Sequence, residues 1–170
     1  VMGDVRSTDL STGYISSLST ATPNGAKMSM YIDMSDGVKI NGVSSVTNAD
    51  NAVDNGVIHL VDQVIGLPTI VTFATANADF STLVSALTRD DQPNFVATLS
   101  TSNGTSPAPF TVFAPTNAAF GSLLTELNAN GLADIDGATL TATLNHHVVA
   151  GANVVAGNLT WVVQEGTGDI

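Results

Sequence analysis

The periodicity of the apolar residues changes at Gly66-Leu67-Pro68, and this change limits the folds open to the chain. Before it, short apolar runs are separated by Asp36-Gly37, Asn41-Gly42 and Asn55-Gly56, pairs that favour tight hairpin turns because both residues tolerate positive φ. After it, apolar residues recur at helical spacing. Strands followed by helices, and then by strands again, predict the α+β class without the regular alternation of a doubly wound sheet.

The N-terminal part is predicted to be antiparallel β-structure. Strands are expected at residues 28–32, 38–40, 43–47 and 57–65. The last of these runs is apolar on both faces and rich in β-branched residues, which is typical of a strand buried on both sides. We therefore expect other parts of the fold to cover both faces of residues 57–65.

The part after Pro68 is predicted to be mainly helical. Thr69 is suited to cap a helix, because a threonine hydroxyl can accept a hydrogen bond from an N–H group of the first turn. Helices are expected at residues 81–88 and 94–99, from Thr116 or Asn117 to 127, and at 138–145. Strands are expected at residues 110–115, 148–149 and 161–163.

The charge balance excludes several classes of partner. Four residues are basic and fifteen are acidic, which gives a net charge of −11. Nucleic acid is excluded as a partner and anionic membranes are disfavoured, because both are bound through clustered Lys and Arg. No apolar run is long enough to cross a bilayer, so direct membrane insertion is not expected. The absence of cysteine excludes disulfides, thiolate catalysis and cysteine-based zinc sites.

Histidines and aspartates are the candidate chemical groups. His59 lies in an apolar run and is interpreted as a hydrogen-bonded core or edge residue. His146 and His147 are adjacent in the sequence, and no further ligand spacing accompanies them. We therefore assign no catalytic, cofactor-binding or metal-ligating residue and expect no cofactor. Two Asp side chains could still meet in space as a hydrolase pair, and Asn103 and Asn158 fit the glycosylation sequon.

Three segments together resemble the signatures of fasciclin-type (FAS1) domains. Residues 110–120, Phe-Thr-Val-Phe-Ala-Pro-Thr-Asn-Ala-Ala-Phe, are similar to the first signature. Residues 55–65, Asn-Gly-Val-Ile-His-Leu-Val-Asp-Gln-Val-Ile, resemble the second signature, which ends such a domain. Residues 144–149 resemble the tyrosine-histidine motif between them, with His146 in place of the tyrosine and His147 matching the histidine.

The resemblance includes residues 80–87, which are similar to the helix that opens the module. It implies an α+β module in which a β-sandwich-like wedge carries a cap of helices. Such modules are secreted or displayed on cell surfaces, often in tandem, and act in adhesion and matrix assembly rather than catalysis. Thr116, Asn117 and His147 match motif positions, and we interpret them as a buried polar network that ties a helix cap to a strand.

The signatures stand in the reverse of the family's order. The segment that ends a module, residues 55–65, precedes the segment that begins one, residues 110–120. We therefore divide the chain into the C-terminal half of one module (residues 1–68), the N-terminal half of a module (69–148) and the start of the next C-terminal half (149–170). The order predicts a permuted or domain-swapped arrangement of half-modules.

Two complementary halves can bury their apolar surfaces in three ways. They can pack together within one chain as a circular permutant, since the termini of domains often lie close together. Each can instead complete the matching half of a neighbouring chain, a head-to-tail exchange that builds a filament. The chain can also be an excised piece of a longer tandem array. An isolated open form is disfavoured because unpaired strand edges promote aggregation.

The two ends of the chain resemble each other. Val1-Met2-Gly3 is similar to Val149-Ala150-Gly151, an offset of 148 residues (149 against 1). Residues 1–22 and 149–170 therefore compete for one structural position in a permuted or swapped module. We expect one of them, at Trp161-Val162-Val163, to extend and contact another subunit, with a merely frayed tail as the alternative.

These observations leave three functional hypotheses. The leading one is a non-enzymatic extracellular or cell-surface module for adhesion and matrix assembly, with self-association into a head-to-tail polymer. Its partners would be proteins, including further copies of itself, and extracellular matrix or polysaccharide. The alternative is a carbohydrate- or small-ligand-binding domain, or a hydrolase whose pocket holds two carboxylates roughly 5–10 Å apart. The third is calcium-dependent adhesion through clustered Asp residues.

Overall fold

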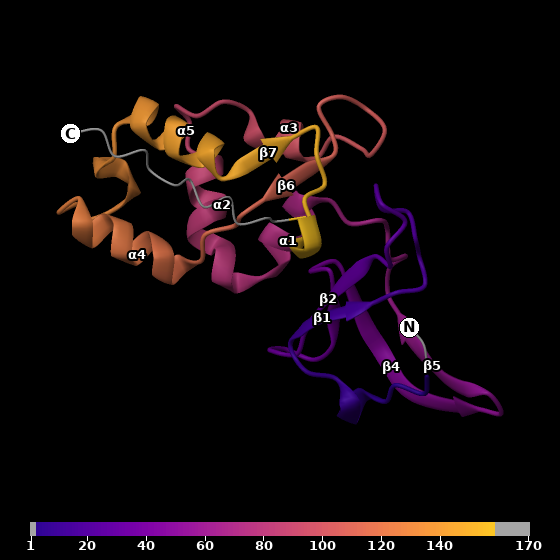
Figure 1. Ribbon diagram of the computed structural model, residues 1–170. Helices are drawn as coiled ribbons and strands as arrows, with labels where there is room; N and C mark the ends of the chain where they lie inside the picture. The colour runs from indigo at the N-terminus through magenta and orange to yellow at the C-terminus, as the bar shows by residue number, and fades with distance from the viewer. Residues whose placement is uncertain (1–2, 159–170) are drawn as a thin grey trace.

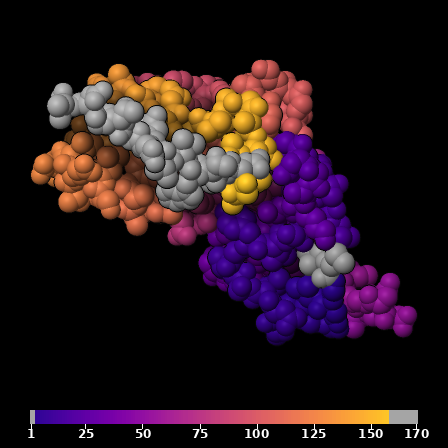
Figure 2. Space-filling view, in the orientation of Figure 1, coloured from indigo at the N-terminus to yellow at the C-terminus, as the bar shows by residue number. Residues whose placement is uncertain are grey.

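A computed structural model of the chain describes residues 3–158, which form two lobes. The strands β1–β5 make up the β lobe (residues 3–67), and the helices α1–α5 surround a small second sheet in the helical lobe (residues 68–158) (Figure 1). In the space-filling view the lobes lie at opposite ends of an elongated molecule (Figure 2). The predicted α+β class is confirmed.

The sheet of the β lobe is an antiparallel meander in which each strand pairs with the next along the chain. Its strands are β1 (Gly13–Ser16), β2 (Ser29–Asp33), β3 (Lys39–Ile40), β4 (Ser44–Val53) and β5 (Gly56–Val61). The turn expected at Asn41-Gly42 joins β3 to β4, with φ angles of 55° and 69°. Both values are positive, as the two central residues of this type of tight turn require, and Val43 completes the connection to β4.

The prediction that residues 57–65 are buried on both sides is wrong. Strand β5 pairs with β4 and lies at the edge of the sheet, and it ends at Val61. Ile58 is 53% exposed and Leu60 is 49% exposed. Both residues therefore present apolar side chains to solvent, because no other described segment covers that face of the strand.

The helical lobe follows the sequence prediction closely. Its elements are α1 (Ile70–Ala76), α2 (Ser81–Leu87), α3 (Phe95–Leu99), β6 (Phe110–Val112), α4 (Asn117–Glu126), α5 (Gly137–His146) and β7 (Val148–Ala150). Short 3₁₀ turns are η1 (Ser7–Asp9), η2 (Ala78–Phe80), η3 (Leu132–Asp134) and η4 (Ala156–Asn158). The hydroxyls of Thr69 and Thr116 accept from the N–H groups of Thr72 and Ala119, which confirms the expected cap at residue 69 and selects Thr116 as the cap of α4.

The main hydrophobic core lies within the helical lobe. Side chains from α2, α3, α4, α5 and the segment before α5 meet there, namely Leu83, Ala86, Phe95, Phe120, Ile135, Leu140 and Leu144. The β lobe buries fewer apolar side chains, with Tyr31 and Ile32 the most enclosed. The seven-residue cluster is the only one of its kind in residues 3–158, so the helical lobe carries most of the burial that holds the described chain together.

The two lobes touch where the β sheet meets α1. The ring of Tyr14 lies edge-on to Phe73 of α1, with centroids 5.4 Å apart, and is tilted against Tyr31 at 5.1 Å. The hairpin turn at Gly42 approaches Ala76 so closely that a Cβ on Gly42 would lie 2.9 Å from the Cβ of Ala76. These contacts set the position of the β lobe relative to the helices.

The two sheets do not form one packed sandwich in this structure. Strands β6 and β7 pair only with each other, from Phe110–Ala150 to Val112–Val148, and the five-stranded sheet is separate. Among the described helices none is long and apolar enough to cross a membrane by itself; α1 and the η2–α2 segment reach that length only together, and they meet at a bend of 101°.

Candidate functional site

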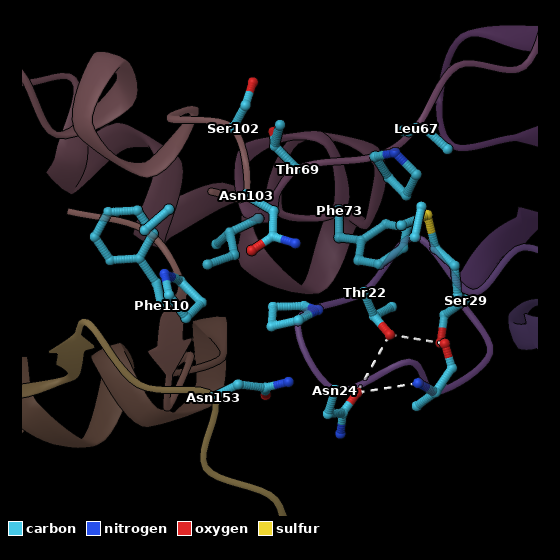
Figure 3. A pocket seen from close by; sticks show the side chains of 18 of the residues that line it. Thr22, Asn24, Ser29, Leu67, Thr69, Phe73, Ser102, Asn103, Phe110 and Asn153 are labelled. Atoms are coloured by element: carbon cyan, nitrogen blue, oxygen red, sulfur yellow. Dashed lines mark hydrogen bonds between the residues drawn. The ribbon is translucent and has the colours of Figure 1, made fainter. Parts of the chain in front are cut away.

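A groove runs between the two lobes and encloses about 600 Å³. One side is formed by the loop before β2, which carries Thr22 and Asn24, and the other by residues around β6 and by the segment before η4, including Phe110 and Asn153. Figure 3 shows Phe73 on the side of Thr22 and Asn24, with Phe110 and Asn153 on the opposite side. The groove therefore exists because of the way the β lobe sits against α1.

The lining of this interlobe groove is mainly apolar, with uncharged polar groups at intervals and one basic residue, Lys27. Aromatic rings come from Phe73 and Phe110, and the amides and hydroxyls come from Thr22, Asn24, Ser29, Thr69, Thr101, Ser102, Asn103 and Asn153. The loop on the β side is held by its own hydrogen bonds, since Thr22 Oγ1 donates to the carbonyl of Ala26 at 2.7 Å and the N–H of Ala26 donates to Asn24 Oδ1 at 3.1 Å (Figure 3). No Asp or Glu among the described residues lines the groove.

A second depression, on the helical lobe, contains the carboxylates that the hydrolase hypothesis would need. Arg89 donates two hydrogen bonds, of 2.6 and 2.7 Å, to the carboxylate of Asp91. This contact lowers the pKa of the Asp91 carboxyl to about 2. Asp136 is also engaged, because it accepts from the N–H of Thr139 as the cap of α5. These carboxylates hold local structure, and nothing in the described residues points to catalysis.

The calcium hypothesis also lacks a site in residues 3–158, because no group of three or more His, Asp or Glu side chains there could hold a metal ion. Asp33 and Asp36 lie at a tight turn, where Asp33 Oδ1 accepts from the N–H of Ser35 at 2.9 Å. This hydrogen bond lowers the pKa of Asp33. The turn matches the hairpin interpretation of this acidic stretch.

The three motif residues contact different partners and do not form one buried network. Asn117 Oδ1 accepts from the N–H of Thr82 at 2.9 Å, and its Nδ2 donates to the carbonyl of Ala78 at 2.9 Å. His147 Nδ1 lies 2.8 Å from the carbonyl oxygen of Phe113, while Thr116 is exposed. Among residues 3–158 no hydrogen bond joins the side chains of Thr116, Asn117 and His147 to one another.

We predict that Asn117→Ala lowers the free energy of unfolding by about 1–3 kcal/mol, because it leaves the N–H of Thr82 and the carbonyl of Ala78 without their partner. The measurement is urea denaturation followed by circular dichroism. Asn145→Ala, on the exposed side of α5, is the matched control and should change stability by less than about 0.5 kcal/mol. Equal effects of the two substitutions would contradict the structural role of Asn117.

A third arrangement lies on the β lobe, where an N-terminal segment crosses the sheet. We call residues 3–10 the strap. Asp50 binds it through both carboxylate oxygens, with Oδ1 accepting from the N–H of Ser7 at 2.8 Å and Oδ2 accepting from the Ser7 hydroxyl. The φ of Asp50 is +61°, at an irregularity in β4 that turns its side chain toward the strap.

His59 of β5 holds the strap at a second point. Its Nε2 lies 2.9 Å from the carbonyl oxygen of Val5, which can only accept, so Nε2 carries the proton. Its Nδ1 accepts from the N–H of Asp50 at 3.3 Å. The interpretation of His59 as a hydrogen-bonded edge residue is therefore confirmed. Sequence reasoning missed its partner Val5, because the two residues are 54 positions apart and no motif links them.

The hydrogen bonds from Ser7 lower the pKa of Asp50 below its usual value of 3.8. The carboxylate therefore stabilises the fold above about pH 4, and this contribution is lost as the pH falls through the lower pKa of the folded state. We predict that Asp50→Asn destabilises the chain at pH 7 and that the difference from the native chain shrinks between about pH 4 and pH 2.

Urea denaturation at a series of pH values measures this effect. Asp54→Asn, in the exposed turn between β4 and β5, removes the same formal charge and serves as the control. A difference between Asp50→Asn and the native chain that stays constant down to pH 2 would contradict the role of the carboxylate.

Trp161, Val162 and Val163, expected as a subunit contact, lie outside the described residues, as does the side chain of Asn158. Sequence reasoning also missed strand β1 and the interlobe groove. The signal for β1 is weak, because Gly13–Ser16 has only two apolar residues, Tyr14 and Ile15, and they are adjacent rather than alternating. The groove has no signal at all in the sequence, since it arises from the packing of the lobes.

The described residues form an α+β fold in which an open groove lies between two lobes and the carboxylates at Asp50, Asp91 and Asp136 hold the strap, a turn and a helix cap. The sequence model of the Fasciclin domain family matches residues 1–68 and 78–164. The chain therefore belongs to the Fasciclin domain family, as its signatures predict. Fasciclin domains are typically extracellular or displayed at the cell surface, mediate protein interactions in general, and are generally non-enzymatic.

Two curated proteins are similar to the chain. A fasciclin-like arabinogalactan protein of Arthroderma benhamiae is 29% identical over 124 residues, which cover 71% of this chain and 26% of that protein. The uncharacterized protein sll1735 of Synechocystis sp. is 41% identical over 85 residues, which cover 50% of this chain and 56% of that protein. The matched region thus spans about a quarter of the first protein and just over half of the second.

Proposed function

We propose that the chain acts outside the cell or at the cell surface in adhesion and matrix assembly, and that it does so by binding further copies of itself through its half-modules. The two stretches that match the family, residues 1–68 and 78–164, correspond to the β lobe and most of the helical lobe. Each lobe has its own sheet. This separation supports the idea that each lobe is one half of a module and can pair with the complementary half of another chain.

The observation that carries this proposal is the apolar outer surface of the β lobe. Ile58 and Leu60 alternate along β5 and are each about half exposed, at 53% and 49%. Val64 and Leu67, in the segment that follows, are 93% and 67% exposed. Contiguous apolar surface of this kind marks protein contacts, and an edge strand offers its free backbone groups to a partner.

A contact between the β lobe of one chain and the helical lobe of another uses two different surfaces. Such a head-to-tail contact does not close on itself, so repetition gives a filament. The net charge of −11 keeps single chains apart at low ionic strength, and salt therefore promotes the association by screening this repulsion.

Sedimentation velocity across a dilution series tests the proposal. We expect the average mass to rise with concentration and with salt, and Ile58→Lys to shift this rise to concentrations about tenfold higher. Ser35→Lys, in the exposed turn between β2 and β3, adds the same charge to the β lobe outside β5 and the segment that follows it, and should leave the series unchanged. A chain that stays monomeric at every concentration, or an equal effect of both substitutions, would overturn self-association.

The interlobe groove favours a second candidate function, the binding of a neutral polysaccharide chain. Sugar rings bind to proteins through aromatic side chains combined with amides and hydroxyls. The groove offers Phe73 and Phe110 beside Asn24, Asn103 and Asn153, with no described carboxylate to repel or hydrolyse a sugar (Figure 3). A groove open along one side also suits a chain better than a small enclosed ligand.

Affinity electrophoresis in gels that contain neutral polysaccharides tests this second function. We expect retardation of the native chain and a loss of most of it in Phe110→Ala. Phe113→Ala removes an equally large side chain that is 51% exposed and lies outside the groove lining, so it should be retarded like the native chain. The same mobility with and without polysaccharide would exclude this function.

A further inference from the structure

The strap closes a cavity in the β lobe. The cavity holds about 230 Å³ and lies between the strap and the sheet. The strap contributes Val5 and Leu10, and the sheet contributes apolar side chains from all five strands, namely Ile15, Met30, Ile32, Ile40, Val46 and Val57. Asp50 and His59 hold the strap over this cavity through its backbone at Ser7 and Val5. We call this apolar position on the sheet the slot, and Asp50 and His59, which bind the strap there, its anchors.

A second segment of the chain resembles the strap in local structure, with one more residue between its glycine and its 3₁₀ turn. Gly3 and Gly151 both have positive φ, at 98° and 76°, and lie 148 residues apart (151 against 3). The 3₁₀ turns Ser7–Asp9 and Ala156–Asn158 follow each glycine, 149 residues apart (156 against 7). At the same offset Val154 corresponds to Val5, and Leu159 corresponds to Leu10 in the sequence. We call residues 151–158 the second strap.

The second strap rests on other partners in this structure. The N–H of Gly151 donates to the carbonyl of Pro107 at 3.1 Å, and the N–H of Val154 donates to the hydroxyl of Thr111 at 2.7 Å. Val155 is 41% exposed. The described residues therefore contain two straps and one five-stranded sheet with a slot for a strap.

We propose that the second strap of one chain occupies the strap position on the β lobe of a second copy. This inference rests on the proposed self-association and adds a contact at the slot, which is lined by Val57 and His59 of β5 rather than by the exposed Ile58 and Leu60. It is domain swapping between duplicated segments, joining the C-terminal end of one chain to the β lobe of the next.

Asp50 and His59 can bind either strap, because the N–H and carbonyl groups that they contact belong to the backbone. The N–H of residue 156 can take the place of the Ser7 N–H at Asp50 Oδ1, and the carbonyl of Val154 can take the place of the Val5 carbonyl at His59 Nε2. Ala156 has no hydroxyl to give to Asp50 Oδ2, so the second strap makes one hydrogen bond fewer. The chain's own strap is therefore preferred at low concentration, and exchange grows with concentration.

A reversible lock on the strap provides the main test. The chain has no cysteine of its own, and the side chains of Ser7 and Asp50 touch, so Ser7→Cys with Asp50→Cys places two thiols where they can form a disulfide. We expect the oxidised chain to stay monomeric over about a hundredfold range of concentration. After reduction it should associate again. An oxidised chain that associates as well as the reduced one would overturn the exchange.

Mixing two single variants shows which segment enters the slot. A chain with Asp50→Cys and another with Ala156→Cys should form a mixed disulfide dimer on oxidation, which only contact between two chains can produce. Ser122→Cys, on the exposed side of α4, replaces Ala156→Cys in the control mixture and should give several-fold less dimer. Equal yields from the two mixtures would contradict the assignment of the second strap.

A peptide provides a test on the native chain, in case the cysteine variants do not fold. A synthetic peptide of residues 151–163 should compete for the slot and shift the sedimentation profile toward monomer, whereas a scrambled peptide should not. Association that the peptide leaves unchanged would overturn the exchange while leaving self-association through another surface intact. A native chain that never associates would remove both the exchange and the proposed self-association.

Discussion

Leu140→Ala is expected to lower the free energy of unfolding by about 3–4 kcal/mol. Leu140 is fully buried, with 0% of its surface exposed, and packs among Leu83, Phe120 and Leu144 in the core of the helical lobe. Truncating a fully buried leucine removes its burial energy and leaves a cavity that rigid neighbouring helices fill only in part. Urea denaturation followed by circular dichroism at 222 nm measures the loss of the helices.

Leu127→Ala is the matched control for this core substitution. Leu127 follows α4 and is 50% exposed, so its loss should cost less than about 1 kcal/mol. A loss for Leu140→Ala no larger than for Leu127→Ala would contradict the position of the core.

The local features of the fold could be predicted from the sequence because short-range chemistry determines them. Asn41-Gly42 forms the expected hairpin turn, since both residues accept positive φ. Thr69 and Thr116 cap helices because their hydroxyls reach the N–H groups of the first turn. The family signatures identified the Fasciclin domain through segments of this kind, whose residues are contiguous in the chain.

The features that depend on contacts far apart in the chain could not be predicted. The apolar run at β5 indicates burial on both faces, but an apolar pattern does not say which segment covers each face, and Ile58 and Leu60 are half exposed here. The strap anchors pair Asp50 with Ser7 across 43 residues. The sequence around Gly3 resembles the sequence around Gly151. This likeness indicates that the two segments are related, but it does not indicate where the strap binds on the sheet.

The same limit applies to the motif residues. Thr116 and Asn117 are adjacent in the sequence and His147 matches a motif position, which suggested one network. In the structure Asn117 binds Ala78 and Thr82 before and within α2, while His147 binds Phe113 at the end of β6. Adjacent residues at the start of a helix point in different directions, so shared membership of a motif does not predict a shared contact.

Gly42→Ala is expected to destabilise the chain by about 2–4 kcal/mol, because it disturbs the place where the lobes meet. The added Cβ would lie 2.9 Å from the Cβ of Ala76 and 3.0 Å from its Cα, so either α1 or the hairpin turn must move. The φ of Gly42 is 69°, a conformation that costs alanine about 1 kcal/mol by itself. The measurement is urea denaturation of the purified chain.

Gly25→Ala separates the two causes. Gly25 has a φ of 70°, almost the same as Gly42, but its added Cβ would meet no atom within 4 Å. This control should therefore lose only the backbone contribution, about 1 kcal/mol. The difference between the two variants measures the close approach of the turn to α1. Equal losses would mean that the lobes do not pack at Gly42.

The consequence of Gly42→Ala for function follows from the same contact. The loop of Thr22 and Asn24 forms the β side of the groove. The sheet that carries this loop packs on α1, where Gly42 contacts Ala76 and Tyr14 contacts Phe73. A shift of the lobes should therefore reduce retardation by a polysaccharide that binds in the groove. It should leave the strap slot intact, since Asp50, His59 and the strap all belong to the β lobe. Self-association that survives Gly42→Ala while polysaccharide binding is lost would assign the two activities to the two separate sites.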